Sequence, residues 1–361
     1  MVALYVSSRL PAERMGRCGK AGAIGSHNRG KCALAVSFRP GHGLGRERAD
    51  ANQEPHVPRR RLCFKSPRVP ARARMAAGIR RLISRRAGLV VPGVYDALGA
   101  RLAGLAGFEA MFQTGYGTSA SMLGMPDYGF AGAGETVSNA TRICRAAEAP
   151  VIVDADTGYG NALSVWRLVK SLEGAGAAGI FLEDQRWPKR CGHMAGKEVT
   201  EYAEYAEKLG AALDARESRD FVIVARTDAR ATLGLDEAIT RARASRKLGA
   251  DASFVEAPQS RSEMRRVGAS VSGPLVANMI EGGRTPILPS CELHDMGFNI
   301  VLYPLSALFA SAHATLGALR ELKRTGATRA ASKRMVGFGE FNELVGLGHY
   351  QRMERRYARR R

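Results

Sequence analysis

The sequence predicts an α/β fold and, within that class, a closed (βα)8 barrel of the TIM type. Between residues 89 and 325, eight short apolar runs rich in β-branched residues alternate with helical segments, a pattern typical of repeated βα units and a parallel sheet. One barrel of this kind needs about 250 residues. The 361 residues therefore accommodate a barrel at 75–325 and two flanking segments, 1–74 and 326–361.

The predicted strands are runs of five to eight mainly apolar residues bounded by polar or glycine-containing segments. In order they are LVVPGV (89–94), AMFQTG (110–115), VIVDAD (151–156), GIFLED (179–184), FVIVARTD (221–228), ASFVEA (252–257), LVANM (275–279) and NIVLYP (299–304). Helical periodicity is clearest at 162–175, 235–248 and 260–271, and glycine ends several of the helical segments. Met75 and the helical pattern after it mark the start of the globular part.

The segment after the last predicted strand is unusually apolar. Residues 303–319 contain no Lys, Arg, Asp or Glu. A helix that is apolar around most of its surface is buried on more than one side. The C-terminal segment 326–361, which we predict to be helical with a basic tail, is one element able to cover it.

The net charge of +20 suggests a nucleic-acid partner, but its distribution argues against one. Residues 1–74 hold 16 basic and 4 acidic residues, residues 352–361 hold 6 and 1, and the intervening 75–351 hold 32 and 29. The barrel is thus nearly neutral, and charge runs at chain ends are usually solvated. Residues 1–74 are predicted to be a disordered basic extension or untranslated upstream sequence. A transit peptide fits less well, because an amphipathic stripe is absent.

Composition also bears on the compartment. No run of about 18 apolar residues without charge occurs, so neither a membrane span nor a membrane partner is predicted. The six cysteines lack CxxC spacing, which argues against a zinc site or a disulfide framework. Free cysteines indicate a reducing compartment, and we predict a cytoplasmic protein.

Functional groups follow almost every predicted strand at its carboxyl end, where TIM barrels place their chemistry. These residues are Tyr95, Asp96, Thr114, Gly115, Tyr116, Asp154, Asp156, Glu183, Asp184, Arg226, Asp228, Glu256, Asn278, Pro304 and Ser306. Helix capping explains only some of them. Because carboxylates follow four neighbouring strands, the mouth of the barrel is predicted to be an active site.

Asp154 and Asp156 lie two residues apart at the end of a buried strand, so an ideal strand would point both carboxylates the same way. Two like charges there need a cation, and Mg²⁺ binds through one or two carboxylates while keeping waters. Glu183 is placed to hold a metal-bound water. The alternative is structural: Asp156 caps the next helix and Asp154 pairs with Arg226.

The segment QRWPKRCGHMAGKEV places Cys191 and His193 among Lys189, Arg190 and Lys197 in a glycine-punctuated loop. Such an electropositive surrounding lowers the pKa of a thiol. A polar loop is also a poor place for a packing cysteine, which favours a reactive role for Cys191 over an inert one.

Together these residues resemble the isocitrate lyase and phosphoenolpyruvate mutase superfamily. The resemblance spans about residues 78–325 and is carried by TGYGTSASMLGMPDYG, VDADTGYGNA, GIFLEDQ, PKRCGH, ARTDA, VEAP, ANMIEGG and YPLSA. It implies a TIM-type barrel whose last helix is exchanged between subunits, and a homotetramer built as a dimer of dimers.

The resemblance also implies three groups of site residues. The metal group, for Mg²⁺ or its substitute Mn²⁺, is Asp154, Asp156, Glu183 and Asp127. The substrate-binding group is Thr114, Gly115, Tyr116, Lys189, Arg190, Gly192, Glu256 and Asn278. The catalytic group is Cys191, His193 and Arg226, with Cys191 as the general acid of a mobile loop.

The implied activity is Mg²⁺-dependent retro-aldol cleavage of a 2-hydroxy dicarboxylate into a 2-keto acid and a carboxylic acid. Cys191 favours a lyase, because the related mutases lack it. Phe112 stands where enzymes that cleave isocitrate and methylisocitrate carry tyrosine, which favours substituted malates such as 2,3-dimethylmalate. The alternatives are a carboxyphosphonoenolpyruvate phosphonomutase and an oxaloacetate decarboxylase or hydrolase of the same superfamily.

Overall fold

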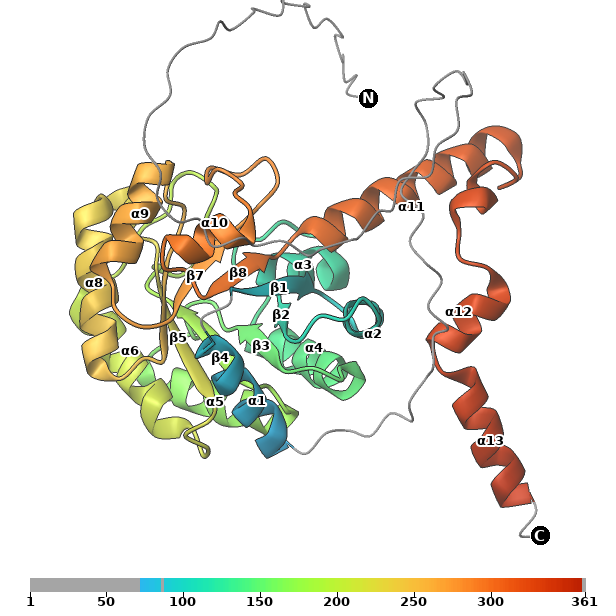
Figure 1. Ribbon diagram of the computed structural model, residues 1–361, viewed down its shortest axis with the longest axis horizontal. Helices are drawn as coiled ribbons and strands as arrows, with labels where there is room; N and C mark the ends of the chain where they lie inside the picture. The colour runs from blue at the N-terminus through green and yellow to red at the C-terminus, as the bar shows by residue number, and fades with distance from the viewer. Residues whose placement is uncertain (1–71, 86–87, 359–361) are drawn as a thin grey trace, which may run out of the picture. The chain divides into compact units, whose positions relative to one another are not determined.

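The computed structural model describes residues 72–85 and 88–358, and the predictions made for residues 1–71 lie outside these ranges. Consecutive strands pair in parallel and β8 pairs with β1, which closes the barrel (Figure 1). The strands are β1 (Leu89–Val94), β2 (Met111–Gln113), β3 (Val151–Asp154), β4 (Gly179–Glu183), β5 (Val222–Thr227), β6 (Ala252–Val255), β7 (Leu275–Asn278) and β8 (Ile300–Tyr303). The predicted (βα)8 barrel is confirmed.

Helices cover the outside of the barrel and continue beyond it. They are α1 (Arg72–Ile83), α2 (Ala97–Leu105), α3 (Gly115–Thr118), α4 (Ala133–Ala146), α5 (Ala162–Ala175), α6 (Tyr202–Ala215), α7 (Ala229–Thr232), α8 (Leu235–Leu248), α9 (Arg261–Ser270), α10 (Ser290–Asp295), α11 (Ser306–Thr325), α12 (Phe338–Leu344) and α13 (Leu347–Ala358). A π-helical turn, η1 (Ser119–Leu123), and a 3-10 turn, η2 (Ala331–Arg334), complete the set. Gly176 and Gly249 end α5 and α8 in the left-handed conformation, as glycine allows.

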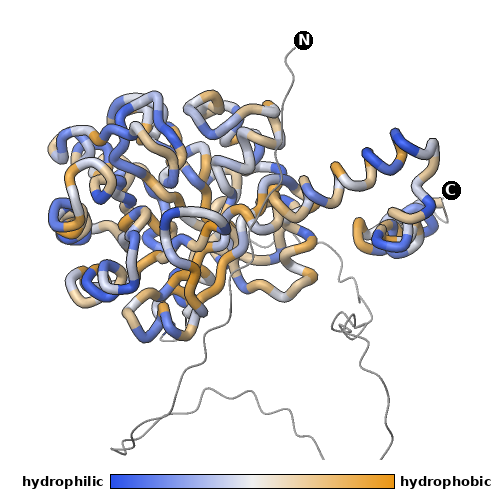
Figure 2. Tube along the Cα trace, turned by 90° about the horizontal axis from the view of Figure 1, so that it is seen from above, coloured by the Kyte–Doolittle hydropathy of each residue, from blue (hydrophilic) through white to orange (hydrophobic). Residues whose placement is uncertain are grey.

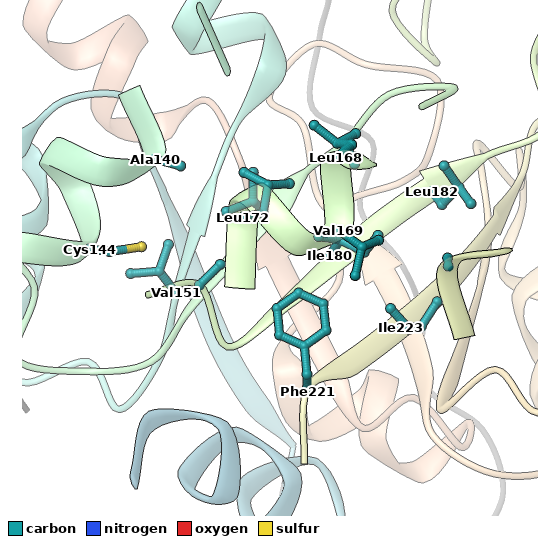
Figure 3. Packing of buried hydrophobic residues seen from close by; sticks show 14 of the residues in the cluster. Ala140, Cys144, Val151, Leu168, Val169, Leu172, Ile180, Leu182, Phe221 and Ile223 are labelled. Atoms are coloured by element: carbon teal, nitrogen blue, oxygen red, sulfur yellow. The ribbon is translucent and has the colours of Figure 1, made fainter. Parts of the chain in front are cut away.

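Alternation along each strand separates two packed layers. On β4, Ile180 and Leu182 pack against the surrounding helices, while Phe181 between them faces the barrel interior. Figure 3 shows Leu168 and Leu172 of α5 packed in the outer layer with Ile180. The strands are therefore buried on both faces, which explains why they are continuous apolar runs.

Helix α1 closes one end of the barrel. Its side chains Ile79 and Leu82 belong to the same buried cluster as Phe181 of the interior. Gly78 of α1 lies against Pro150, the residue that precedes β3, so α1 covers the amino-terminal ends of the strands. Only the carboxyl-terminal ends remain as an entrance.

Helix α11 departs from expectation. It leaves the barrel after β8 (Figure 1), and hydrophobic residues recur along it (Figure 2). None of its residues is buried in the single chain, and Phe309, Leu316 and Leu319 are exposed. The C-terminal helices do not supply the cover that the apolar sequence requires. Among the described helices, none combines the length and hydropathy that a membrane crossing requires.

Candidate active site

The carboxyl-terminal strand ends surround one cavity at the mouth of the barrel. The predicted site residues on its wall are Thr114, Tyr116, Asp127, Asp154, Cys191, Gly192, His193, Arg226, Glu256 and Asn278. Apolar side chains complete the wall: Phe112, Phe254, Ile280, Leu302, Pro304 and Leu305. The loop after β4 lies over the cavity and leaves a volume of about 40 Å³, room for a few water molecules. The structure therefore represents a closed site.

The carboxylates of Asp154 and Asp156 converge on the backbone of Gly115. A Cβ atom on Gly115 would lie 2.9 Å from Oδ2 of Asp154 and 3.2 Å from Oδ1 of Asp156. The two acids meet because Asp156 follows the strand with φ of 47°, and not through strand alternation as we expected. Glycine is required at position 115 because any side chain would displace one of the acids.

Lys189 lies inside this acidic cluster. Its Nζ is 2.6 Å from Oδ1 of Asp127 and 2.6 Å from Oδ1 of Asp156, and all three side chains are buried. Burial raises the pKa of Asp156 to about 6, because the charge of Lys189 only partly offsets the desolvation. Lys189 is thus placed to neutralise the acids and is absent from the cavity wall where we expected it to bind substrate.

Arg226 connects the ends of three strands. Its Nε lies 2.9 Å from Oδ2 of Asp228 and 3.3 Å from Oε2 of Glu183, and its Nη2 lies 3.1 Å from Oε2 of Glu256. Lys197 Nζ approaches Asp228 from the other side, at 2.6 Å. Burial alone would raise the pKa of Asp228, but Arg226 and Lys197 hold it below its usual range. The guanidinium is fixed in place by ion pairs.

The donor set fits a hard divalent cation. Oε1 of Glu183 is buried without a hydrogen-bond partner, while Oδ1 of Asp156 and Oε2 of Glu183 form ion pairs with Lys189 and Arg226. Within the described residues no three His, Cys, Asp or Glu side chains lie close enough to hold a metal unaided. Mg²⁺ does not need three, because it keeps several waters and takes one or two carboxylates. Asp154, which lies on the cavity wall, is the carboxylate best placed to bind a cation there.

The structural alternative for Asp156, that it caps the next helix, does not hold. The side chain that caps α5 is that of Asn161, which accepts from the backbone N–H of Leu163 and Ser164. Asp156 instead accepts a hydrogen bond from the Tyr159 hydroxyl at 2.8 Å.

The segment after β2 presents hydroxyl groups to the cavity. Thr114 caps α3, and its Oγ1 accepts from the backbone N–H of Gly117 at 3.3 Å. Burial raises the pKa of Tyr116, and the nearby Cys191 and Asp127 add to that rise. Tyr116 therefore stays protonated and can donate to a bound carboxylate.

Cys191 lies on the cavity wall within the loop after β4, and its backbone N–H donates to the carbonyl of Asp127 at 3.2 Å. Our expectation of a lowered thiol pKa is wrong. Burial, with Asp127 nearby, raises the pKa of Cys191 to about 11. The lysine that should have lowered it, Lys189, is already paired with two acids. At neutral pH the thiol is protonated, the state that a general acid needs.

His193 and Asn278 both contact Glu256. His193 Nε2 lies 3.0 Å from Oε1 of Glu256, and Asn278 Nδ2 donates to the same carboxylate at 3.3 Å. Gly192 allows this approach, because a Cβ there would lie 2.5 Å from both Arg226 and Glu256. The loop is in close contact with the strand ends beneath it.

Two site residues differ from the sequence-based picture. Arg190 does not face the cavity: its guanidinium stacks on the Tyr128 ring at 4.8 Å and donates to the carbonyl of Ala195. Arg284, which we did not select, contacts His193 from the loop after β7. Arg284 lies in the segment EGGRTP (281–286), which contributes to the family resemblance, but the segment does not reveal this contact because the partner is distant in sequence.

Comparison with known proteins identifies the family to which the chain is similar. A family model described as phosphoenolpyruvate phosphomutase matches residues 79–323. The chain is 46% identical to 2,3-dimethylmalate lyase of Eubacterium barkeri over 78% of this chain and 98% of that protein. It is 47% identical to the chloroplastic carboxyvinyl-carboxyphosphonate phosphorylmutase of Arabidopsis thaliana over 79% and 86% of the two chains. It is 46% identical to the petal death protein of Dianthus caryophyllus over 77% and 87%.

Solved structures show the same barrel. Oxaloacetate acetylhydrolase with 3,3-difluorooxalacetate gives a TM-score of 0.75 at 34% identity, covering 79% of this chain and 97% of that one. For 2,3-dimethylmalate lyase the TM-score is 0.74 at 38% identity, over 78% and 95%. For phosphonopyruvate hydrolase with oxalate and Mg²⁺ it is 0.72 at 29% identity, over 79% and 99%. The chain belongs to the phosphoenolpyruvate phosphomutase family, within the superfamily that also contains isocitrate lyase.

Proposed function

We propose that this protein is a carbon–carbon lyase that cleaves a 2-hydroxy dicarboxylate, such as 2,3-dimethylmalate or a related substituted malate, into a 2-keto acid and a carboxylic acid. The observation that carries the proposal is the protonated thiol of Cys191 on the wall of a cavity that also exposes Asp154. A proton donor and a cation-binding acid in one cavity are what retro-aldol cleavage requires.

Asp154 and Asp156 would hold Mg²⁺ or Mn²⁺, with Glu183 and Asp127 in the outer shell. The cation, when bound, would acidify the substrate hydroxyl and stabilise the forming keto acid. The Oε1 atom of Glu183, buried without a hydrogen-bond partner, supports this proposal, as does the Mg²⁺ bound to the related phosphonopyruvate hydrolase.

Protein groups would orient the substrate and protonate the departing fragment. Thr114 and Tyr116 would donate to its carboxylate, and the fixed guanidinium of Arg226 would neutralise charge. The C2 hydroxyl would give its proton to a water molecule in the cavity, from which the Cys191 thiolate is later reprotonated, and its oxygen becomes the keto oxygen. As the bond between C2 and C3 breaks, its electron pair passes to C3 and its carboxylate. Cys191 Sγ then gives its proton to C3, which releases the carboxylic acid. The closed loop would exclude water during this step.

The cavity wall favours a small, partly apolar substrate. Arg226 is the only lysine or arginine among the described residues on the wall, and three carboxylates already surround it. Phe112 and Ile280 offer contacts for alkyl substituents rather than for a third carboxylate. We therefore favour alkylmalates over methylisocitrate.

Two other activities deserve testing because relatives carry those names. A carboxyvinyl-carboxyphosphonate phosphorylmutase is 47% identical to this chain, and an oxaloacetate acetylhydrolase gives a TM-score of 0.75. A phosphonomutase protonates no departing carbon and would tolerate the loss of Cys191. An oxaloacetate hydrolase also protonates its departing fragment, so its substrate distinguishes it from the lyase.

Release of 2-keto acid from malate, 2-methylmalate, 2,3-dimethylmalate, methylisocitrate and oxaloacetate tests the proposal. We expect pyruvate from an alkylmalate, abolished by EDTA, restored by Mg²⁺, and reduced by about 10²- to 10⁴-fold in Cys191→Ala. Cys291→Ala, which removes an exposed thiol, is the matched control. Turnover of oxaloacetate alone, or full activity of Cys191→Ala, would contradict the proposal.

We also propose that α11 is exchanged between subunits of a homotetramer, because none of its residues is buried against the described part of the chain. The cytoplasmic location stays a prediction from the cysteine content.

A further inference from the structure

Two loops that are distant in sequence meet over the cavity. The backbone N–H of Arg284, in the loop after β7, donates to Nδ1 of His193 at 2.8 Å. The Arg284 side chain donates through Nε to the carbonyl oxygen of His193 at 3.0 Å. His193 is therefore held through both its ring and its backbone by a loop that lies outside the Cys191 segment.

Gly283 makes this contact sterically possible. A Cβ atom on Gly283 would lie 2.5 Å from Nδ1 and 2.9 Å from Cε1 of His193, closer than real Cβ atoms approach other atoms. Such an atom would also lie 3.0 Å from the carbonyl oxygen of Ile280, so the backbone leaves little room to move. A side chain at position 283 would push the His193 ring away.

The same contact fixes the proton on the ring. Because Nδ1 accepts a hydrogen bond, the proton of the neutral imidazole resides on Nε2. Nε2 lies 3.0 Å from Oε1 of Glu256, whose other oxygen lies 3.1 Å from Arg226. A continuous chain of polar contacts therefore runs from Arg284 through His193 to Glu256 on the cavity wall.

The chain reaches Cys191 through the local backbone. Cys191 lies two residues before His193, and its carbonyl accepts a hydrogen bond from the backbone N–H of Met194 at 2.9 Å. Fixing His193 therefore restrains the short turn that carries the thiol. In the opposite direction, release of His193 would free this turn to leave the cavity.

We propose that Gly283 and Arg284 form a latch that keeps the Cys191 loop closed over the cavity, and that His193 is a positioning residue held by this latch. The catalytic consequence rests on the proposed lyase activity. The latch itself does not, since closure of the loop is measurable without substrate.

The test measures the alkylation rate of Cys191 by iodoacetamide, quantified by peptide mass spectrometry with Cys291 as the internal reference. Arg284→Ala removes the Nε bond and should raise the rate about three- to tenfold, the factor that one hydrogen bond is worth. Gly283→Ala should raise it at least as much. The controls are Arg265→Ala, an exposed arginine on α9, and Gly134→Ala, where a Cβ would meet no atom within 4 Å.

For turnover of an alkylmalate we expect kcat to fall in both latch variants by about the factor by which alkylation rises, with both controls unchanged. Alkylation at the native rate in Arg284→Ala and Gly283→Ala would overturn the latch. If Gly283→Ala does not fold, as circular dichroism would show, Arg284→Ala decides alone. Faster alkylation in a protein that releases no keto acid would leave the latch standing and would refute the proposed function.

Discussion

At the scale of single residues, burial outweighs nearby charge in setting the pKa shifts of Cys191 and Asp156. The pKa of Cys191 is raised to about 11 and that of Asp156 to about 6, although a lysine lies within the cluster. Desolvation acts on the charged form of each group, and Lys189 is shared between two acids. The site thus holds a protonated thiol next to a cluster of carboxylates that is paired with Lys189.

The raised pKa of Cys191 predicts a pH dependence. A general acid works while it is protonated, so lyase activity should hold a plateau from pH 7 to about pH 10 and fall as the pH approaches 11. A thiol with an ordinary value would lose activity from about pH 8.5. The pH profile of kcat, compared with thiolate absorbance in wild type and Cys191→Ala, checks this. A loss of activity near pH 8 that follows thiolate formation would contradict it.

The sequence predicts residues that follow strands better than residues that meet across loops. Asp154, Arg226 and Glu256 lie in the cavity region because the carboxyl ends of parallel strands converge there. The partners of Lys189 and the role of Arg284 depend on how the loops after β4 and β7 fold over the mouth of the barrel. The spacing of residues in the sequence does not reveal these contacts. The sign of the Cys191 shift was missed because sequence shows charge but not burial.

At the scale of elements, the loop after β4 is tied to the barrel by a buried ion pair. The side chains of Lys197 and Asp228 are 1% and 0% exposed, and the Lys197 ammonium also contacts the carbonyl of Gly192. Removing one member of such a pair strands the other charge away from water. The ion pair that holds the loop in place therefore contributes to the stability of the fold as well as to the geometry of the site.

Lys197→Met should therefore lower the free energy of unfolding by about 3 kcal/mol, with Arg226 limiting the cost because it still pairs with Asp228. Urea denaturation followed by circular dichroism measures the change. Lys247→Met, at an exposed position near the end of α8, is the control and should stay within about 0.5 kcal/mol of wild type. Equal midpoints for the two variants would show that the pair is not a structural tie.

At the scale of the whole molecule, the barrel strands are buried within the chain, whereas α11 has no buried residue. The alternation of eight strands with helices was readable from sequence because each strand is buried on both faces. The sequence does not show which surface packs against α11, because an apolar helix can be covered by its own chain or by another subunit. No residue of α11 is buried, and the proposal above assigns its cover to a second subunit.

Size-exclusion chromatography with light scattering tests this assignment. Wild type should be a tetramer, and Leu316→Glu combined with Leu319→Glu should give a smaller species, because each change places a charge on the apolar helix. Lys323→Ala on the same helix should leave the assembly intact. A monomeric wild-type protein would exclude the exchanged helix.

Cleavage of 2,3-dimethylmalate in D₂O tests the central claim most directly, because it follows the proton that Cys191 is proposed to deliver. Mass spectrometry should show pyruvate and propionate in equal amounts, with one deuterium on the propionate methylene carbon, and both products should fall together in Cys191→Ala. Pyruvate and singly deuterated propionate formed at the wild-type rate by Cys191→Ala, or no cleavage by Mg²⁺-loaded wild type, would contradict it.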